Sequence, residues 1–83
     1  MRIFGRPSTP MREYQPIKAA ELEDLELVAD PATLRRLASF LQQVAAEMDA
    51  KGPRFDHVHL LDSWNAHGTN TPDMVVSRVA NAT

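Results

Sequence analysis

One long helix is predicted by the sequence DPATLRRLASFLQQVAAEMDAKGP, residues 30–53. Asp30 can cap a helix, because its carboxylate can accept hydrogen bonds from backbone N–H groups two or three residues later. Pro31 suits the first helical position, where its missing N–H leaves no hydrogen bond unmade. Gly52 and the proline after it can end the helix, since glycine readily takes a left-handed cap and proline cannot continue the turn. We therefore predict one helix over about residues 31–50, roughly 30 Å long.

This predicted helix is amphipathic. Its apolar residues recur at spacings of three and four and form one stripe; they are Leu34, Leu37, Ala38, Leu41, Val44, Ala45 and Met48. The residues predicted to face water are Arg35, Arg36, Gln42, Gln43 and Glu47. Phe40 falls at the margin of the stripe, where it would cover a sheet edge. A helix with such a stripe is expected to pack across several strands.

Three segments around the helix have strand character. Residues 22–29 alternate between apolar and acidic side chains, which predicts a half-buried strand with an acidic outer face. Residues 55–61 place apolar side chains on both faces, which is typical of a central strand. Residues 74–79 are rich in valine, which favours a short final strand.

The other segments are predicted to be loops or chain ends. Residues 5–10 and 62–72 have the composition of loops. Pro16 cannot donate to a strand ladder, so it limits the segment around it to an edge strand. Residues 1–20 are therefore predicted to be a less ordered or edge-strand segment, and residues 80–83 a frayed tail.

Together these elements predict a single α+β domain over residues 1–83. One long amphipathic helix would pack on one face of a roughly four-stranded, mainly antiparallel sheet. A chain of 83 residues leaves no room for a second core. Because one helix covers one sheet face only, the other face is expected to be polar, covered by a loop or used for association.

The composition excludes several classes of function. The chain has no cysteine, so it has neither a disulfide nor a thiolate site. Its net charge of −2 argues against binding nucleic acid, which requires a concentrated basic surface. It shows neither the apolar run of a signal peptide nor one of the ~20 residues that would span a membrane. We therefore expect a cytoplasmic protein that binds neither nucleic acid nor a membrane.

Two histidines are the strongest candidates for chemistry. His57 and His59 alternate on a predicted strand, so both imidazoles would project to one side and could share a metal. Zinc catalysis normally needs three protein ligands, and the third would come from His67 or the N-terminal segment. Hydrogen bonding on a sheet face, or a role in a recognition surface, is the favoured interpretation. We expect no metal.

An enzyme is the weaker hypothesis. The serines lie in no recognised nucleophile setting. The three glycines form neither a phosphate-binding loop nor a dinucleotide fingerprint, so no cofactor is expected.

Other features suggest binding. Trp64, the only tryptophan, lies in a predicted polar loop and is either an interface anchor or a lid over the core. Residues 21–30 carry five acidic side chains and no basic one. This run is either a solvated strand edge, which is the favoured reading, or a negative surface that attracts a basic partner.

The order of motifs over about residues 22–79 resembles a known family. An acidic strand leads into the Asp-Pro start of the helix, followed by Phe-Asp-His-Val-His-Leu at residues 55–60 and Pro-Asp-Met-Val-Val at residues 72–76. This pattern is similar to small α+β immunity proteins of bacterial polymorphic-toxin and contact-dependent competition systems. The resemblance implies a cytoplasmic inhibitor that binds a cognate protein toxin made by the same cell and encoded in a neighbouring reading frame.

The leading hypothesis is thus a toxin-neutralising protein without catalytic activity. Its predicted contact residues are His57, His59, Asp62 and Trp64, with Glu23, Asp24 and Glu26 as a second patch. That acidic patch would suit a toxin with a basic cleft, such as a nuclease. The alternative is a homodimeric structural or regulatory module that associates through the uncovered sheet face. The third hypothesis is a metal-dependent site at the two histidines.

Overall fold

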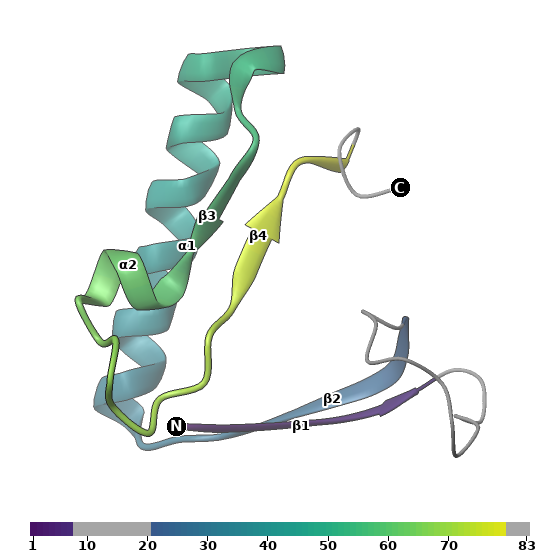
Figure 1. The fold of residues 1–83 in the computed structure, drawn as a ribbon, viewed down its shortest axis with the longest axis vertical. Helices are drawn as coiled ribbons and strands as arrows, with labels where there is room; N and C mark the ends of the chain where they lie inside the picture. Colours follow the sequence, from purple (N-terminus) through teal and green to yellow (C-terminus); the bar gives the residue numbers. More distant parts are fainter. Residues whose placement is uncertain (8–20, 80–83) are drawn as a thin grey trace.

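The computed structural model describes residues 1–7 and 21–79 (Figure 1). Its elements are β1 (Arg2–Pro7), β2 (Leu22–Val28), α1 (Pro31–Lys51), the 3-10 helix η1 (Gly52–Arg54), β3 (His57–His59), α2 (Leu60–Trp64) and β4 (Val75–Ser77). The predicted α+β class with one long helix is confirmed. The edge strand around Pro16 and the frayed tail at residues 80–83 lie outside the described residues. Of the predicted loop at residues 5–10, the first three belong to β1.

The predicted ends of α1 are confirmed to within one residue. Asp30 is the N-cap, and its Oδ1 accepts a 2.8 Å hydrogen bond from the backbone N of Thr33. This bond satisfies one of the N–H groups that a helix start leaves unpaired. Gly52 follows the helix with a φ of 55°, and its N–H donates to the carbonyl of Met48. A positive φ at this position favours glycine, because it has no Cβ to clash with the backbone.

The buried face of α1 is rotated from the predicted stripe. The core consists of the side chains buried to 4% exposure or less, namely Leu37, Phe40, Val44, Phe55 and Leu60. Phe40, predicted at the margin, is 3% exposed and lies at the centre, whereas Leu34 and Leu41 are each 44% exposed. The prediction was wrong for these three side chains, because the covering elements select one side of a broad apolar stripe.

The predicted four-stranded sheet is wrong. The described strands form two antiparallel pairs, β1–β2 and β3–β4. The β3–β4 pair lies alongside α1, whereas the β1–β2 ribbon extends away from the base of that helix (Figure 1). The predicted central strand is also wrong, because β3 has three residues and pairs only with β4 among the described strands.

The β1–β2 ribbon has two distinct faces. Residues directly opposite each other in an antiparallel pair share a face, and Ile3 faces Leu27 while Phe4 faces Glu26. One face therefore carries the apolar side chains of Ile3, Leu25 and Leu27, and the other carries Asp24 and Glu26 together with Phe4. The predicted half-burial of β2 is wrong, since all its residues are exposed and Leu25 reaches 53%.

A short helix replaces the end of the predicted strand at residues 55–61. Leu60, fully buried, begins α2, and its N–H donates a 2.8 Å hydrogen bond to the carbonyl of Met74. This bond joins the start of α2 to the segment that leads into β4. The predicted loop at residues 62–72 is correspondingly shorter, because its first three residues are helical. Asn65 ends α2 in the left-handed conformation, with a φ of 49°.

Candidate partner-binding surface

The two histidines of β3 lie together, as the strand period predicts. The ring centroids of His57 and His59 are 5.0 Å apart in an edge-to-face arrangement. Each ring also has an aspartate partner: Nδ1 of His57 lies 2.7 Å from Oδ2 of Asp56, and Nδ1 of His59 lies 2.6 Å from Oδ2 of Asp73. With exposed fractions of 44% and 38%, both imidazoles can reach a partner protein.

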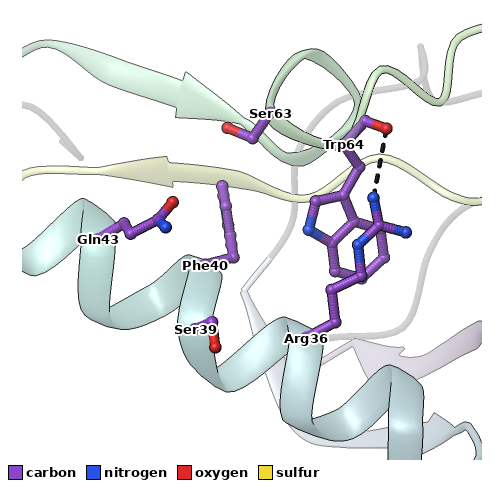
Figure 2. A pocket seen from close by; sticks show the side chains of 6 residues that line it. All are labelled: Arg36, Ser39, Phe40, Gln43, Ser63 and Trp64. Carbon is purple, nitrogen blue, oxygen red and sulfur yellow. Dashed lines mark hydrogen bonds between the residues drawn. The ribbon is translucent and has the colours of Figure 1, made fainter.

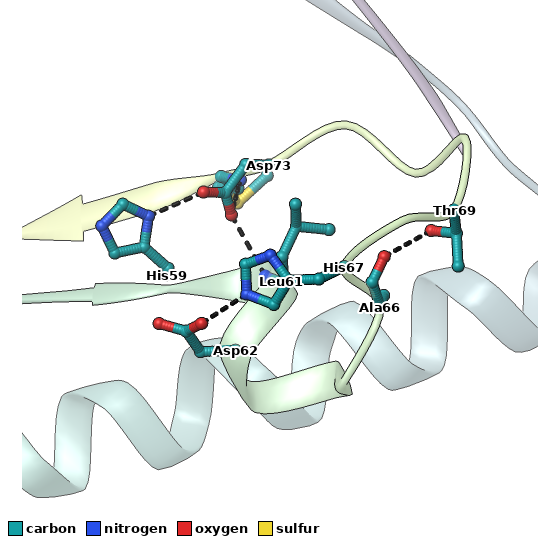
Figure 3. Close-up of polar contacts among 8 residues, drawn as sticks. His59, Leu61, Asp62, Ala66, His67, Thr69 and Asp73 are labelled. Carbon is teal, nitrogen blue, oxygen red and sulfur yellow. Dashed lines mark hydrogen bonds and ion pairs between the residues drawn. The ribbon is translucent and has the colours of Figure 1, made fainter.

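Asp73 connects three parts of this surface (Figure 3). Besides its contact with His59, its Oδ1 accepts hydrogen bonds from the backbone N of Leu61 at 3.1 Å and of Met74 at 2.9 Å. The hydrogen bond from His59 is the main cause of a lowered pKa of the Asp73 carboxyl, and the backbone bond from Leu61 adds to it. The same pairing raises the pKa of His59 above its ordinary value of 6.5. The carboxylate therefore fixes the junction of β3, α2 and β4.

The third histidine does not join the other two. Nε2 of His67 lies 2.5 Å from Oδ1 of Asp62, and both side chains are exposed (Figure 3). Within residues 1–7 and 21–79, no group of three or more potential ligands could hold a metal ion. His67 thus pairs with Asp62 and does not act as a third ligand beside His57 and His59.

Trp64 is the last residue of α2, where the sequence predicted a loop. It is half-buried and packs against the core, as expected of a lid. Arg36, on α1, lies over its ring with the guanidinium carbon 4.4 Å from the ring centroid. Nη2 of Arg36 also donates a 3.4 Å hydrogen bond to the backbone carbonyl of Trp64 (Figure 2). The cation–π contact holds the guanidinium against the indole, and the bond to the backbone carbonyl adds a second contact between the same two residues.

A pocket of about 190 Å³ lies beside this pair, between α1 and α2. Its lining consists of Arg36, Ser39, Phe40, Gln43, Ser63 and Trp64 (Figure 2). From the sequence, Arg36 and Gln43 are predicted to be solvent-facing residues of the helix without a function. The pairing of Arg36 with a residue 28 positions away leaves no local signal in the sequence.

The predicted acidic patch lies on the other sheet. Glu23, Asp24 and Glu26 are all exposed on β2. Arg6 of β1 forms ion pairs with the first two, at 3.6 Å to Glu23 and at close range to Asp24. The ribbon thus neutralises part of the charge that the sequence suggested. The structure brings His57 and His59 together on β3, and Asp62 and Trp64 together on α2, but it places the acidic residues apart.

The described fold can be compared with known proteins. The model of the Immunity protein 32 family matches residues 24–79, a span that begins within β2 and includes α1, β3, α2 and β4. The chain belongs to the Immunity protein 32 family. This membership confirms the resemblance to immunity proteins of toxin systems. Comparisons with curated proteins and with solved structures gave no match. In the described part of this Immunity protein 32 member, no helix has the length and apolar character needed to cross a membrane.

Proposed function

We propose that this Immunity protein 32 member neutralises a cognate bacterial toxin by binding it, without catalysis of its own. The observation that carries the proposal is the family match, because it covers every element that builds the β3–α2 surface. The toxin would contact this surface through His57, His59, Asp62 and Trp64. The acidic side chains of Glu23, Asp24 and Glu26 would form a second contact.

The chemistry of the β3–α2 surface supports this role. Interfaces are enriched in tryptophan and arginine, and their strongest contacts lie where such side chains are already held in place. Trp64 meets this description, because packing against the core and stacking with Arg36 fix its ring before any partner arrives. A side chain that is fixed in advance loses little conformational entropy on binding.

Affinity capture tests the proposal. Tagged protein would be retrieved from its native lysate, and the retained chains would be identified and expressed for binding measurements. We expect a toxin chain that binds the wild type tightly. Trp64→Ala should weaken binding by about tenfold or more, whereas Trp64→Phe, which keeps an aromatic ring against the core, should weaken it less. Circular dichroism would verify that both variants fold.

Two histidine substitutions test the contact set. His57 belongs to the set, whereas His67 touches it only through its pairing with Asp62. His57→Ala should therefore weaken toxin binding more than His67→Ala. Unchanged binding by both His57→Ala and Trp64→Ala would place the toxin elsewhere on the molecule.

A homodimeric module is the second candidate, and the exposed apolar face of the ribbon favours it. Ile3, Leu25 and Leu27 share this face, and Leu25 is 53% exposed. A two-stranded ribbon is only marginally stable by itself, so a second copy could cover it. Sedimentation over a range of concentrations would show a dimer that Leu25→Asp disrupts. A monomer at all concentrations would contradict this candidate.

A further inference from the structure

We infer that the pocket between α1 and α2 receives the carboxylate side chain of a glutamate or aspartate of the toxin. The inference rests on the proposed function and specifies the chemistry of one contact. It depends on three features of the pocket: the hydrogen-bonding groups in its lining, the apolar ring of Phe40 beside them and its volume.

The walls of the pocket suit an anion. Arg36, Ser39, Gln43 and Ser63 contribute a guanidinium, two hydroxyls and an amide, all of which can donate hydrogen bonds. No acidic residue lines the pocket, although the chain as a whole carries a net charge of −2. The pocket is therefore a positively charged site on an acidic protein, and an acidic side chain is the complement that such a site selects.

Arg36 is held in a position to bind a carboxylate. A guanidinium has five N–H donors in a planar fork, and the bond to the Trp64 carbonyl uses one of them. Stacking on the Trp64 ring fixes the plane of the fork, and a fork in a fixed plane can bind a carboxylate through two parallel hydrogen bonds. In Figure 2 the guanidinium of Arg36, from α1, lies over the indole of Trp64, from α2, at one end of the pocket lining.

The apolar part of the lining and the volume of the pocket favour a single side chain over a free ligand. Phe40 is 3% exposed and offers an apolar contact for the methylene groups of a glutamate or aspartate. The volume of about 190 Å³ is below the roughly 300–1,000 Å³ of pockets that bury drug-sized molecules. The occupant is accordingly one acidic side chain presented by the toxin.

The sequence of α1 contains two matched pairs for the test. Arg35 and Arg36 are neighbours of the same type, and so are Gln42 and Gln43; in each pair only the second lines the pocket. Each substitution in the pocket thus has a control with the same change of charge on the same helix. Gln43→Glu keeps both members of the Arg36–Trp64 pair and places a competing carboxylate in the pocket, so its effect does not require the removal of Arg36.

The first measurement needs no toxin. Trp64 is the only tryptophan, so the single indole N–H resonance in an NMR spectrum reports on the pocket. N-acetyl-glutamate N-methylamide should shift this resonance saturably, and the neutral glutamine analogue should shift it less. The response should be lost in Arg36→Ala and Gln43→Glu but kept in Arg35→Ala and Gln42→Glu. Equal shifts by the two analogues would overturn the carboxylate assignment.

The second measurement uses the captured toxin. Arg36→Ala and Gln43→Glu should each raise the dissociation constant about tenfold or more, while Arg35→Ala and Gln42→Glu should change it by less than about threefold. If the wild type neutralises the toxin but the two substitutions of each pair change the dissociation constant equally, the inference is overturned and the proposed function stands. If the wild type binds no toxin, both the proposed function and the assignment of a toxin side chain to the pocket are overturned. The NMR titration would still show whether the pocket prefers a carboxylate to an amide.

Discussion

At the scale of single residues, Asp73 makes polar contacts with three residues at the junction of β3, α2 and β4. Its carboxylate accepts hydrogen bonds from two backbone N–H groups, those of Leu61 and Met74, and it pairs with the imidazole of His59. The pairing lowers the pKa of Asp73 and raises the pKa of His59. Opposite shifts in one pair define a range of pH in which both groups are charged and the pair stabilises the fold most.

This range leads to a prediction about stability and pH. Because the pKa of folded His59 is raised, its contribution is full below its ordinary value of 6.5 and is lost as the pH rises through the raised value. Because the pKa of folded Asp73 is lowered, its contribution is full above its ordinary value of 3.8 and is lost as the pH falls through the lowered value. The pair should therefore contribute most between about pH 4 and 6.5.

Thermal unfolding of the wild type and of Asp73→Asn checks this prediction. The wild type should have the higher Tm, and the difference should be larger at pH 5.5 than at pH 8.5. Some difference should persist at high pH, because the carboxylate still accepts the two backbone hydrogen bonds. A difference that grows from pH 5.5 to pH 8.5 would contradict the assigned pairing.

Some contacts between single residues can be predicted from the sequence, and others cannot. The alternation of a strand was enough to predict that His57 and His59 lie together. The pairing of His59 with Asp73 joins residues 14 positions apart, and that of Arg36 with Trp64 joins residues 28 positions apart. Such pairs depend on how the helices and strands pack against each other, so no local sequence pattern predicts them.

At the scale of elements, α1 was predictable in extent but not in orientation. Its ends depend on local chemistry, namely the Asp30 cap and the Gly52 turn. Which side of the helix is buried depends on the elements packed against it, and these bury Phe40 and expose Leu41. Helix α2 was missed for a similar reason, since its first turn is stabilised by the carboxylate of Asp73, 12 residues beyond Leu61.

The orientation of α1 predicts unequal costs for two neighbouring substitutions. Phe40→Ala should lower the free energy of unfolding by about 3–5 kcal/mol, because it removes a buried aromatic ring from the core cluster. Leu41→Ala should lower it by about 1 kcal/mol or less, because that side chain is already 44% exposed. Urea denaturation would measure both changes. A cost for Leu41→Ala equal to that for Phe40→Ala would contradict the observed rotation of the helix.

The β1–β2 ribbon should be the less stable element. Two-stranded pairs are marginal unless another element packs on them, and every residue of β2 is exposed. Amide hydrogens of β2 should therefore exchange faster than those around Phe40 and Val44, the buried centre of α1. Exchange followed by NMR would show this order. Protection of β2 equal to that of α1, in dilute protein, would indicate that the ribbon is covered in solution.

At the scale of the whole molecule, the fold separates two candidate contacts of opposite charge. The positive pocket lies between α1 and α2, and the acidic side chains lie on the ribbon. The prediction of a four-stranded sheet was wrong at this scale, because the pairing of distant strands is not encoded in the pattern of any single segment. The family match begins within β2, so β1 lies outside the part that the family model covers.

Charge at this scale should govern the rate of encounter with a basic toxin. Reversing Asp24 and Glu26 to lysine should slow association about tenfold at low salt and flatten its dependence on salt concentration. The matched control reverses Glu47 and Asp49 on α1, which changes the net charge by the same amount outside the proposed contact. Stopped-flow mixing with the captured toxin would measure both rates. If both double variants slow association equally, the rate depends on the net charge of the protein and on no specific acidic patch.

Growth rescue in a sensitive host tests whether the protein neutralises a toxin by binding it. The reading frames beside the gene would be expressed in a sensitive host, alone and with this protein. We expect that one of them stops growth, that the wild type restores it, and that Trp64→Ala restores it poorly at equal protein levels. A neighbouring toxin that kills equally well with and without the folded wild-type protein would contradict the claim.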